Sequence, residues 1–232
     1  MHFRISPITL LALSLLFLTK LNAGALTWEK DRIVTEIMKG DQAEVRVTFP
    51  FKNAGDHPVT IMAVQTSCGC TTAGLSKKTY AAGESGQIAV AFDVGERIGL
   101  QQKYITVTTD EPHQPPIRLL LQVNIKEYFS LDPELLQWNV AGKPAEQTAV
   151  LSALTSQSII AVEAKTEPAG VFETRIEVVG KGRKYNVEIK PLSTTRQSRA
   201  VVTLRIKFTS VAERTAKIYV LVNPPGVSET DD

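Results

Sequence analysis

Apolar residues recur at every second position in one stretch of this chain, and that pattern constrains the fold more than any other feature. Residues 117–125 place an apolar side chain at every second position. A period of two is typical of a β-strand with one buried face, whereas an amphipathic helix repeats every 3.6 residues. No long helical periodicity occurs elsewhere in the chain. The sequence therefore predicts an all-β fold.

Short β-prone segments separated by turn residues continue through both halves of the chain. They are 26–36, 43–53, 59–65, 71–75, 87–94, 102–109 and 117–126 in the first half, and 135–140, 148–154, 159–165, 171–179, 184–189, 200–208 and 216–222 in the second. Each half has the size of an immunoglobulin-like sandwich, about 100 residues. We expect two tandem immunoglobulin-like β-sandwich domains at 26–126 and 127–223, then a disordered acidic tail at 224–232.

The first residues have the composition of a secretory signal peptide. A basic start at Arg4 precedes an apolar run from Ile8 to Leu18, and a small-x-small site follows at Ala23-Gly24-Ala25. The run is shorter than the roughly 20 residues that span a bilayer, so we expect removal of residues 1–25 and no membrane span in the mature protein. We predict export by the Sec route to the periplasm or the extracellular space.

Charge points to no class of partner. Without Arg4 and Lys20, the basic side chains equal the 24 acidic ones in number, and each half is balanced. A nucleic acid partner would favour a basic excess, which is missing. We expect instead a protein or glycan partner in the cell envelope, because sandwiches present strand edges and loop tips to ligands.

The only two cysteines, Cys68 and Cys70, are one residue apart at the end of a predicted strand. In an extended strand they would lie about 6.6 Å apart on one face, too far to bond, so a disulfide requires a tight turn. Gly69 permits such a turn, and Ser67 and Thr71 flank it. A labile redox disulfide, a pair of thiolates for Cu(I) and an inert turn all remain open.

Counting strand reversals locates the cysteine turn within the first domain. Each turn between antiparallel strands sends the chain to the opposite end of the sandwich. If residues 71–75 form a strand, the cysteine turn lies at the end nearer the second domain, and His57 and His113 lie at the far end.

Catalytic constellations are missing from the sequence. His57 and His113 lie in proline-flanked loops, where a surface histidine is a better interpretation than a general base. Ser67 has no assignable histidine partner, and residues 180–184 have the composition of a hairpin turn without Walker spacing. We expect no catalytic residue and no cofactor in this chain, with thiol redox chemistry as the one activity left open.

Five motifs, in this order, resemble the bacterial domain-of-unknown-function 1573 family over roughly residues 26–126. They are Trp28-Glu29, Phe51-Lys52-Asn53-Ala54-Gly55-Asp56, Ser67-Cys68-Gly69-Cys70-Thr71, Gly83-Glu84-Ser85-Gly86 and Gly95-Glu96-Arg97-Ile98-Gly99. The resemblance implies an exported immunoglobulin-like sandwich, related in shape to Hydin-type and major-sperm-protein-type modules, and it implies no activity.

The sequence as a whole predicts a non-enzymatic binding or scaffold module of unknown ligand. The alternative is a periplasmic thiol-disulfide or Cu(I)-handling protein that acts through Cys68 and Cys70. These two hypotheses differ in the state of the two sulfurs and in what lies around them.

Overall fold

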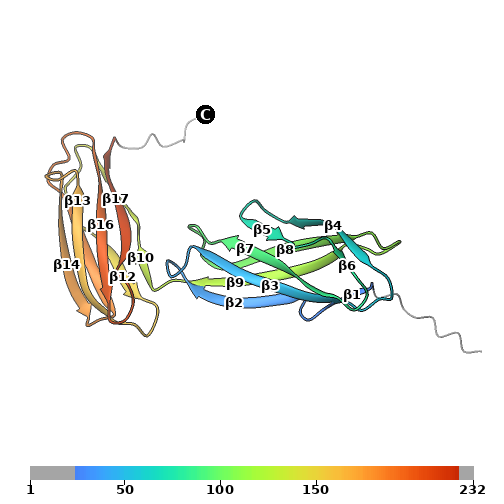
Figure 1. The fold of residues 1–232 in the computed structure, drawn as a ribbon. Coiled ribbons are helices and arrows are strands. Elements are labelled where there is room, and N and C mark those ends of the chain that lie inside the picture. Colours follow the sequence, from blue (N-terminus) through green and yellow to red (C-terminus); the bar gives the residue numbers. More distant parts are fainter. Residues whose placement is uncertain (1–23, 225–232) are drawn as a thin grey trace, which may run out of the picture.

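The computed structural model of the protein describes residues 24–224. The predicted signal peptide and acidic tail lie almost entirely outside these residues. Seventeen β-strands and no helix occur in the described part, which confirms the all-β class. Accordingly, no helix within residues 24–224 is long and apolar enough to cross a membrane. Figure 1 shows two bodies of strands joined at one place.

Residues 26–126 fold into a sandwich of two sheets. Its strands are β1 (Leu26–Trp28), β2 (Arg32–Met38), β3 (Glu44–Asn53), β4 (Val59–Thr66), β5 (Thr71–Gly74), β6 (Thr79–Tyr80), β7 (Ser85–Asp93), β8 (Gly99–Thr109) and β9 (Ile117–Lys126). One sheet has the order β1-β3-β7-β5 and the other has the order β2-β9-β8-β4-β6. The short strand β6 is the one that the sequence pattern did not indicate.

Alternation in the sequence corresponds to burial in the first sandwich. On β9, Leu119, Leu121 and Val123 are completely buried, while the residues between them are partly exposed. Apolar residues of β3 and β7, in the other sheet, belong to the same hydrophobic core. Burial of each such side chain contributes roughly 1.5–3 kcal/mol, and a slip of one residue would expose them all, so the register is fixed.

The N-terminal run, expected as one β-prone segment at 26–36, is divided between the two sheets. β1 pairs antiparallel with β3, whereas β2 pairs parallel with β9. The chain changes sheets through the irregular residues 29–31. Periodicity could not predict this division, because it reports which face of a strand is buried and not which strand lies beside it.

Residues 129–223 form a second sandwich on the same plan. Its strands are β10 (Phe129–Asp132), β11 (Leu135–Asn139), β12 (Gln147–Ala153), β13 (Ile159–Glu167), β14 (Phe172–Gly180), β15 (Lys184–Pro191), β16 (Ser198–Phe208) and β17 (Arg214–Asn223). The sheet orders, β10-β12-β15-β14 and β11-β17-β16-β13, repeat those of the first sandwich, and β6 alone has no counterpart. All seven strands expected in this half are present, and β10 is additional.

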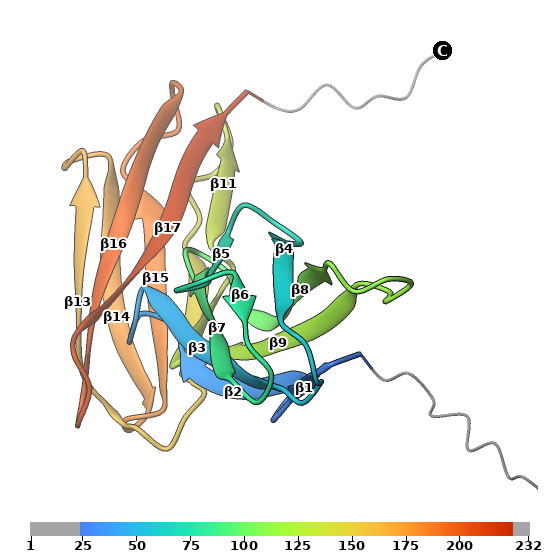
Figure 2. The same ribbon diagram turned by 45° about the vertical axis from the view of Figure 1, so that its right-hand side comes forward.

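Each sandwich has its own hydrophobic core. The described core of the first ends at Ile125, and that of the second begins at Tyr128. The cores therefore lie on either side of Glu127, near which the sequence placed the domain boundary. Figure 2 shows the two sandwiches from a second direction, in which the first lies partly in front of the second.

Three side chains form a polar joint between the two sandwiches, and Met38 on β2 also packs against the second core. Asp41, in the turn between β2 and β3, accepts hydrogen bonds from the Tyr128 hydroxyl at 2.9 Å and from the Arg214 guanidinium at 2.5 Å. The guanidinium also lies 5.0 Å from the centre of the Tyr128 ring. Burial of the phenol, and then its hydrogen bond to the Asp41 carboxylate, raises the pKa of Tyr128. This joint ties the first sandwich to the second through polar contacts.

Candidate functional site

The Cys-Gly-Cys turn joins β4 to β5 and carries the chain from one sheet to the other. Cys68 and Cys70 form a disulfide, with their Cα atoms 5.3 Å apart. Cys70 packs against the first core, and Cys68 is half-buried. The pair is therefore covalently linked and remains partly open to solvent.

The turn lies where the count of strand reversals places it within the sandwich. Residues 71–74 form a strand, and Thr71 pairs with Phe92 near the end of β7. The start of β7 pairs with Lys52, close to the His57 loop. The cysteine turn and His57 are therefore at opposite ends of this sheet.

Two threonines hold the turn in shape. The Thr66 hydroxyl donates to the carbonyl oxygens of Cys68 and Thr71, at 3.2 and 2.9 Å. The side chain of Thr71 is buried, and its hydroxyl lies 3.5 Å from the Cys68 Sγ. A hydroxyl at this position can donate to sulfur, and it would stabilise a thiolate there.

Backbone hydrogen bonds tie the turn to both sheets. On one side, the amide of Ser67 donates to the carbonyl of Tyr104 at 3.0 Å, and the Ser67 hydroxyl accepts from the Tyr104 amide at 3.1 Å. On the other side, the Cys70 carbonyl accepts from the Asp93 amide at 2.9 Å. Ser67 is thus a structural residue of the turn.

Gly69 does not have the role that the sequence suggested. Its φ is not in the left-handed region that favours glycine, and a Cβ built on it meets nothing within 4 Å. The turn therefore does not use the conformational freedom for which Gly69 was expected. An L-residue fits, because the turn is made by its hydrogen bonds and not by an unusual backbone conformation.

Two positively charged side chains lie over the ring of Phe92, the residue that pairs with Thr71. The Lys103 ammonium lies 5.1 Å from the centre of the Phe92 ring, and the Arg97 guanidinium lies 6.0 Å from it. Both cations are attracted to the negative face of the ring. Burial, and then the nearby Arg97 charge, lowers the pKa of Lys103.

A Cu(I) site does not fit this state of the turn. The two sulfurs are bonded to each other, so neither is a thiolate ligand. Within residues 24–224, no group of three or more His, Cys, Asp and Glu side chains could hold a metal ion. A copper site would require reduction of the disulfide and further ligands from another molecule.

The two histidines in the described part of the chain are exposed in loops, as expected. The Nδ1 atom of His57 lies 2.8 Å from a carboxylate oxygen of Asp56, and this hydrogen bond raises the pKa of His57. His113 has a φ of 60° in the loop between β8 and β9. Neither histidine is buried beside a nucleophile.

Asn53 organises the loop after β3, a role that the sequence analysis missed. The side chain is completely buried. Its amide donates to the carbonyls of His57 and Tyr80 at 2.8 and 2.9 Å, and its oxygen accepts from the Gly55 amide at 3.0 Å. The sequence signal for this role was an asparagine at a strand end, followed by Ala54-Gly55, because asparagine side chains in turns form hydrogen bonds to nearby backbone groups.

A groove between β4 and β5 was also missed. Its volume is about 420 Å³. The lining residues are Ile61, Met62, Ala63, Val64, Ala73, Gly74, Leu75, Ser76, Lys77 and Lys78. The groove is therefore mainly apolar, with two lysines at one end, and the cysteine turn joins the two strands that form its walls.

Both walls of this groove have unpaired strand edges. β5 is the last strand of its sheet. On the outer side of β4, β6 pairs only with Val59 and Thr60, which leaves 62–66 without a ladder partner among the described strands. Met62 in this stretch is 61% exposed. Edge strands of this kind are templates for another strand.

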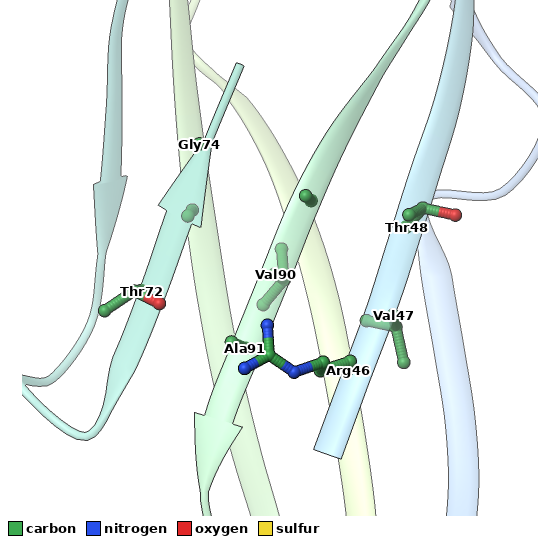
Figure 3. Close-up of a pocket in the computed structure, with 9 residues that line it drawn as sticks. Arg46, Val47, Thr48, Thr72, Gly74, Val90 and Ala91 are labelled. Carbon is green, nitrogen blue, oxygen red and sulfur yellow. The ribbon is translucent and has the colours of Figure 1, made fainter. Parts of the chain in front are cut away.

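A second hollow of about 640 Å³ lies on the outer face of β3, β7 and β5. Figure 3 shows Arg46 reaching from β3 toward Ala91 on β7, with Thr72 and Gly74 on β5 at the other side. The hollow exists because Ala89, Ala91 and Gly74 have small side chains or none. Ala73 and Gly74 line this hollow and the groove, so β5 separates the two.

The solved structures to which the chain is similar are distant from it in sequence and in TM-score. A protein of unknown function from Porphyromonas gingivalis is 10% identical, over 85% of this chain and 99% of that chain, with a TM-score of 0.35. The Pseudomonas aeruginosa CupB2 chaperone is 13% identical over 83% of this chain and 99% of that chain, with a TM-score of 0.34. A PapD-like domain of human CEP192 is 12% identical over 54% of this chain and 98% of that chain, with a TM-score of 0.38.

No curated protein matches the chain. A family model does match, and it covers residues 26–125, which include the Cys-Gly-Cys turn and the nine strands of the first sandwich except Lys126, the last residue of β9. The resemblance found in the sequence is thereby confirmed. Residues 26–125 match the model of the family described as protein of unknown function DUF1573.

Proposed function

We propose that the first sandwich is an exported, non-enzymatic binding domain whose ligand is an extended polypeptide segment that adds to the outer edge of β4. The observation that carries this proposal is the unpaired stretch 62–66, which borders an apolar groove. A segment in this position gains backbone hydrogen bonds from the edge, and its alternate side chains enter the groove.

The groove favours a segment with apolar residues at alternate positions and a carboxylate at one end. Met62, Val64 and Leu75 offer apolar contact. Lys77 already forms an ion pair with Glu84, whereas Lys78 forms none within residues 24–224. The Lys78 ammonium is therefore available to an acidic residue of the ligand.

The disulfide has a structural role in this proposal. It fixes the turn that joins β4 to β5, the two walls of the groove, and it thereby holds the edges of these two strands in fixed positions relative to each other. A disulfide in a half-exposed turn also agrees with an oxidising compartment, which supports a periplasmic or extracellular location. Among the described residues, the site contains no Asp, His and Ser side chains arranged for acyl or phosphoryl transfer.

Selection from a random-sequence peptide library, followed by calorimetry on the selected peptides, tests the proposal. We expect binders with alternating apolar residues and an acidic end. Met62→Glu should weaken them about tenfold or more, because it places a charge in the apolar groove. Val34→Glu is the matched control, because Val34 is 60% exposed on β2 and lies outside the groove. Equal affinity for the two variants would refute the site.

Lys78→Glu provides a second measurement. It should weaken peptides with an acidic end and leave peptides with a neutral end unchanged. If acidic and neutral peptides respond alike, the lysine does not select the ligand, and the charge argument fails.

A second candidate function, thiol-disulfide exchange, is favoured by the Thr71 hydroxyl 3.5 Å from the Cys68 Sγ. In this reaction an external thiolate attacks Cys70, the sulfur–sulfur bond breaks, and Cys68 leaves as a thiolate that the Thr71 hydroxyl stabilises. A second external thiol then releases Cys70, so a dithiol is oxidised as the protein is reduced. Equilibration with glutathione buffers tests it: a pair that stays oxidised in a reducing glutathione buffer is a structural disulfide.

A further inference from the structure

The edge of the second sandwich formed by β14 is one of the two longest sheet edges in the described part of this protein. β14 is the last strand of its sheet, and it has nine residues. The edge strand β13 is equally long, β2 has seven residues, and β1, β5, β6, β10 and β11 have between two and five. Natural proteins keep exposed edges short to prevent pairing with another chain, so a long unpaired edge points to an interface.

The backbone of β14 offers hydrogen-bonding groups on its free side. The amide of Leu192 donates to the carbonyl of Val171 at 3.0 Å, which makes these two a hydrogen-bonded pair of the β14–β15 ladder. Because such pairs alternate with non-hydrogen-bonded ones, the N–H and C=O groups of Thr174, Ile176 and Val178 point away from β15. Three successive outward positions are ready for a further strand.

Charges on β14 identify a second copy of this chain as the partner. Glu173, Arg175 and Glu177 alternate on one face, and all three are exposed. We propose that two copies pair β14 with β14 in antiparallel orientation about a two-fold axis at Ile176. Arg175 of each copy then lies opposite Glu177 of the other, in a non-hydrogen-bonded pair, where side chains approach most closely.

The register of this pairing follows from the strand itself. Ile176 is the midpoint of Phe172–Gly180, so an axis there pairs all nine residues of both strands. An axis at Arg175 would place Glu173 opposite Glu177 and Arg175 opposite itself, so like charges would face each other at all these positions. The outward groups of Thr174, Ile176 and Val178 then form about six hydrogen bonds between the copies.

The other long edge of the same sandwich lacks this complementarity. β13 also has nine residues, and its midpoint is Glu163. Self-pairing about that midpoint would place the two Glu163 carboxylates opposite each other, which is unfavourable. The charge pattern therefore favours self-pairing of β14 and disfavours self-pairing of β13.

The charged side chains of β14 have contacts within the chain but remain accessible to a partner. The Arg175 side chain is 66% exposed although it forms an ion pair with Glu188 on β15. The Glu177 carboxylate accepts one hydrogen bond, from Asn186 at 3.2 Å. Val178 is 60% exposed and would be covered by the partner. β14 lies on the side of the second sandwich away from the first, so the first domains do not obstruct the contact (Figure 1).

Sedimentation of the full protein over a concentration series tests the dimer. An edge-to-edge contact is at the small end of specific interfaces, so we expect a dissociation constant of about 10 μM. Arg175→Glu or Glu177→Arg alone places like charges opposite each other twice, and each should weaken dimerisation at least about tenfold. The control Lys165→Glu, on β13, should leave the dimer unchanged.

Mixing the two single variants gives the decisive measurement. An R175E copy and an E177R copy are complementary to each other at both positions, so the mixture should form a heterodimer although neither variant dimerises alone. The double variant R175E/E177R should dimerise by itself. A protein that stays monomeric at about 1 mM, or a dimer insensitive to both reversals, overturns the proposal. Circular dichroism of each variant distinguishes loss of pairing from loss of fold.

Discussion

Gly86 is the position at which the smallest change should do the most damage to the first sandwich. It lies on β7 opposite Phe51. A Cβ built on Gly86 comes within 2.6 Å of the Phe51 ring and 2.8 Å of the Tyr80 Cζ. Ordinary carbon contacts are about 3.5–4.0 Å, so Gly86→Ala creates an overlap of about 1 Å with two rings.

Neither ring can move away easily. Phe51 and Tyr80 are each 2% exposed, and their centroids are 4.8 Å apart in an edge-to-face arrangement. The Tyr80 hydroxyl is also fixed by donation to the Lys77 carbonyl at 2.8 Å. Overpacking of this kind costs about 1–3 kcal/mol, against a gain of about 0.4–1 kcal/mol from the lower entropy of the unfolded chain. We expect Gly86→Ala to lower the free energy of unfolding by about 1–2 kcal/mol.

Urea unfolding followed by tryptophan fluorescence measures this effect. The chain has two tryptophans, and Trp28 lies 5.0 Å from the Phe51 ring. In a Trp138→Phe background the signal therefore reports the first sandwich alone. Gly69→Ala is the matched control, because its new methyl group meets open space, and it should be neutral or slightly stabilising. If the two alanine variants unfold at the same urea concentration, the packing argument is wrong.

Three further measurements test the described contacts. Asp41→Asn should lower the pKa of Tyr128, which an ultraviolet titration measures. In the parent protein the pKa of this phenol is raised by folding. The stability that it contributes is therefore complete below the pKa of the unfolded state, about 10, and is lost as pH rises through the pKa of the folded state. Asn53→Ala should destabilise the first sandwich by about 1–3 kcal/mol, because buried backbone groups lose their partners, and an unchanged urea midpoint would contradict that role. Replacing Cys68 and Cys70 with alanine should cost no more than about 2 kcal/mol, since so short a loop constrains the unfolded chain little, and failure to fold would show a larger structural role.

The sequence by itself determined the class of fold and most of its strands. Alternation sufficed because one buried face per strand is a local requirement, and it identified all seven strands expected in the second half. It also located the Cys-Gly-Cys turn, since Cys68 and Cys70 are the only cysteines and follow the end of β4 directly. The reversal count succeeded for the same reason: antiparallel neighbours fix the direction of each strand.

Only the tertiary structure decided which strands are neighbours and which edges stay open. The parallel pairing of β2 with β9, the unpaired stretch of β4 and the free edge of β14 depend on contacts between residues far apart in the chain. The same holds for two glycines: Gly69, which was expected to permit the turn, faces open space, whereas Gly86 lies against two buried rings. A local pattern reports the face that a residue uses, but the space around that residue is set by side chains that other strands bring to it.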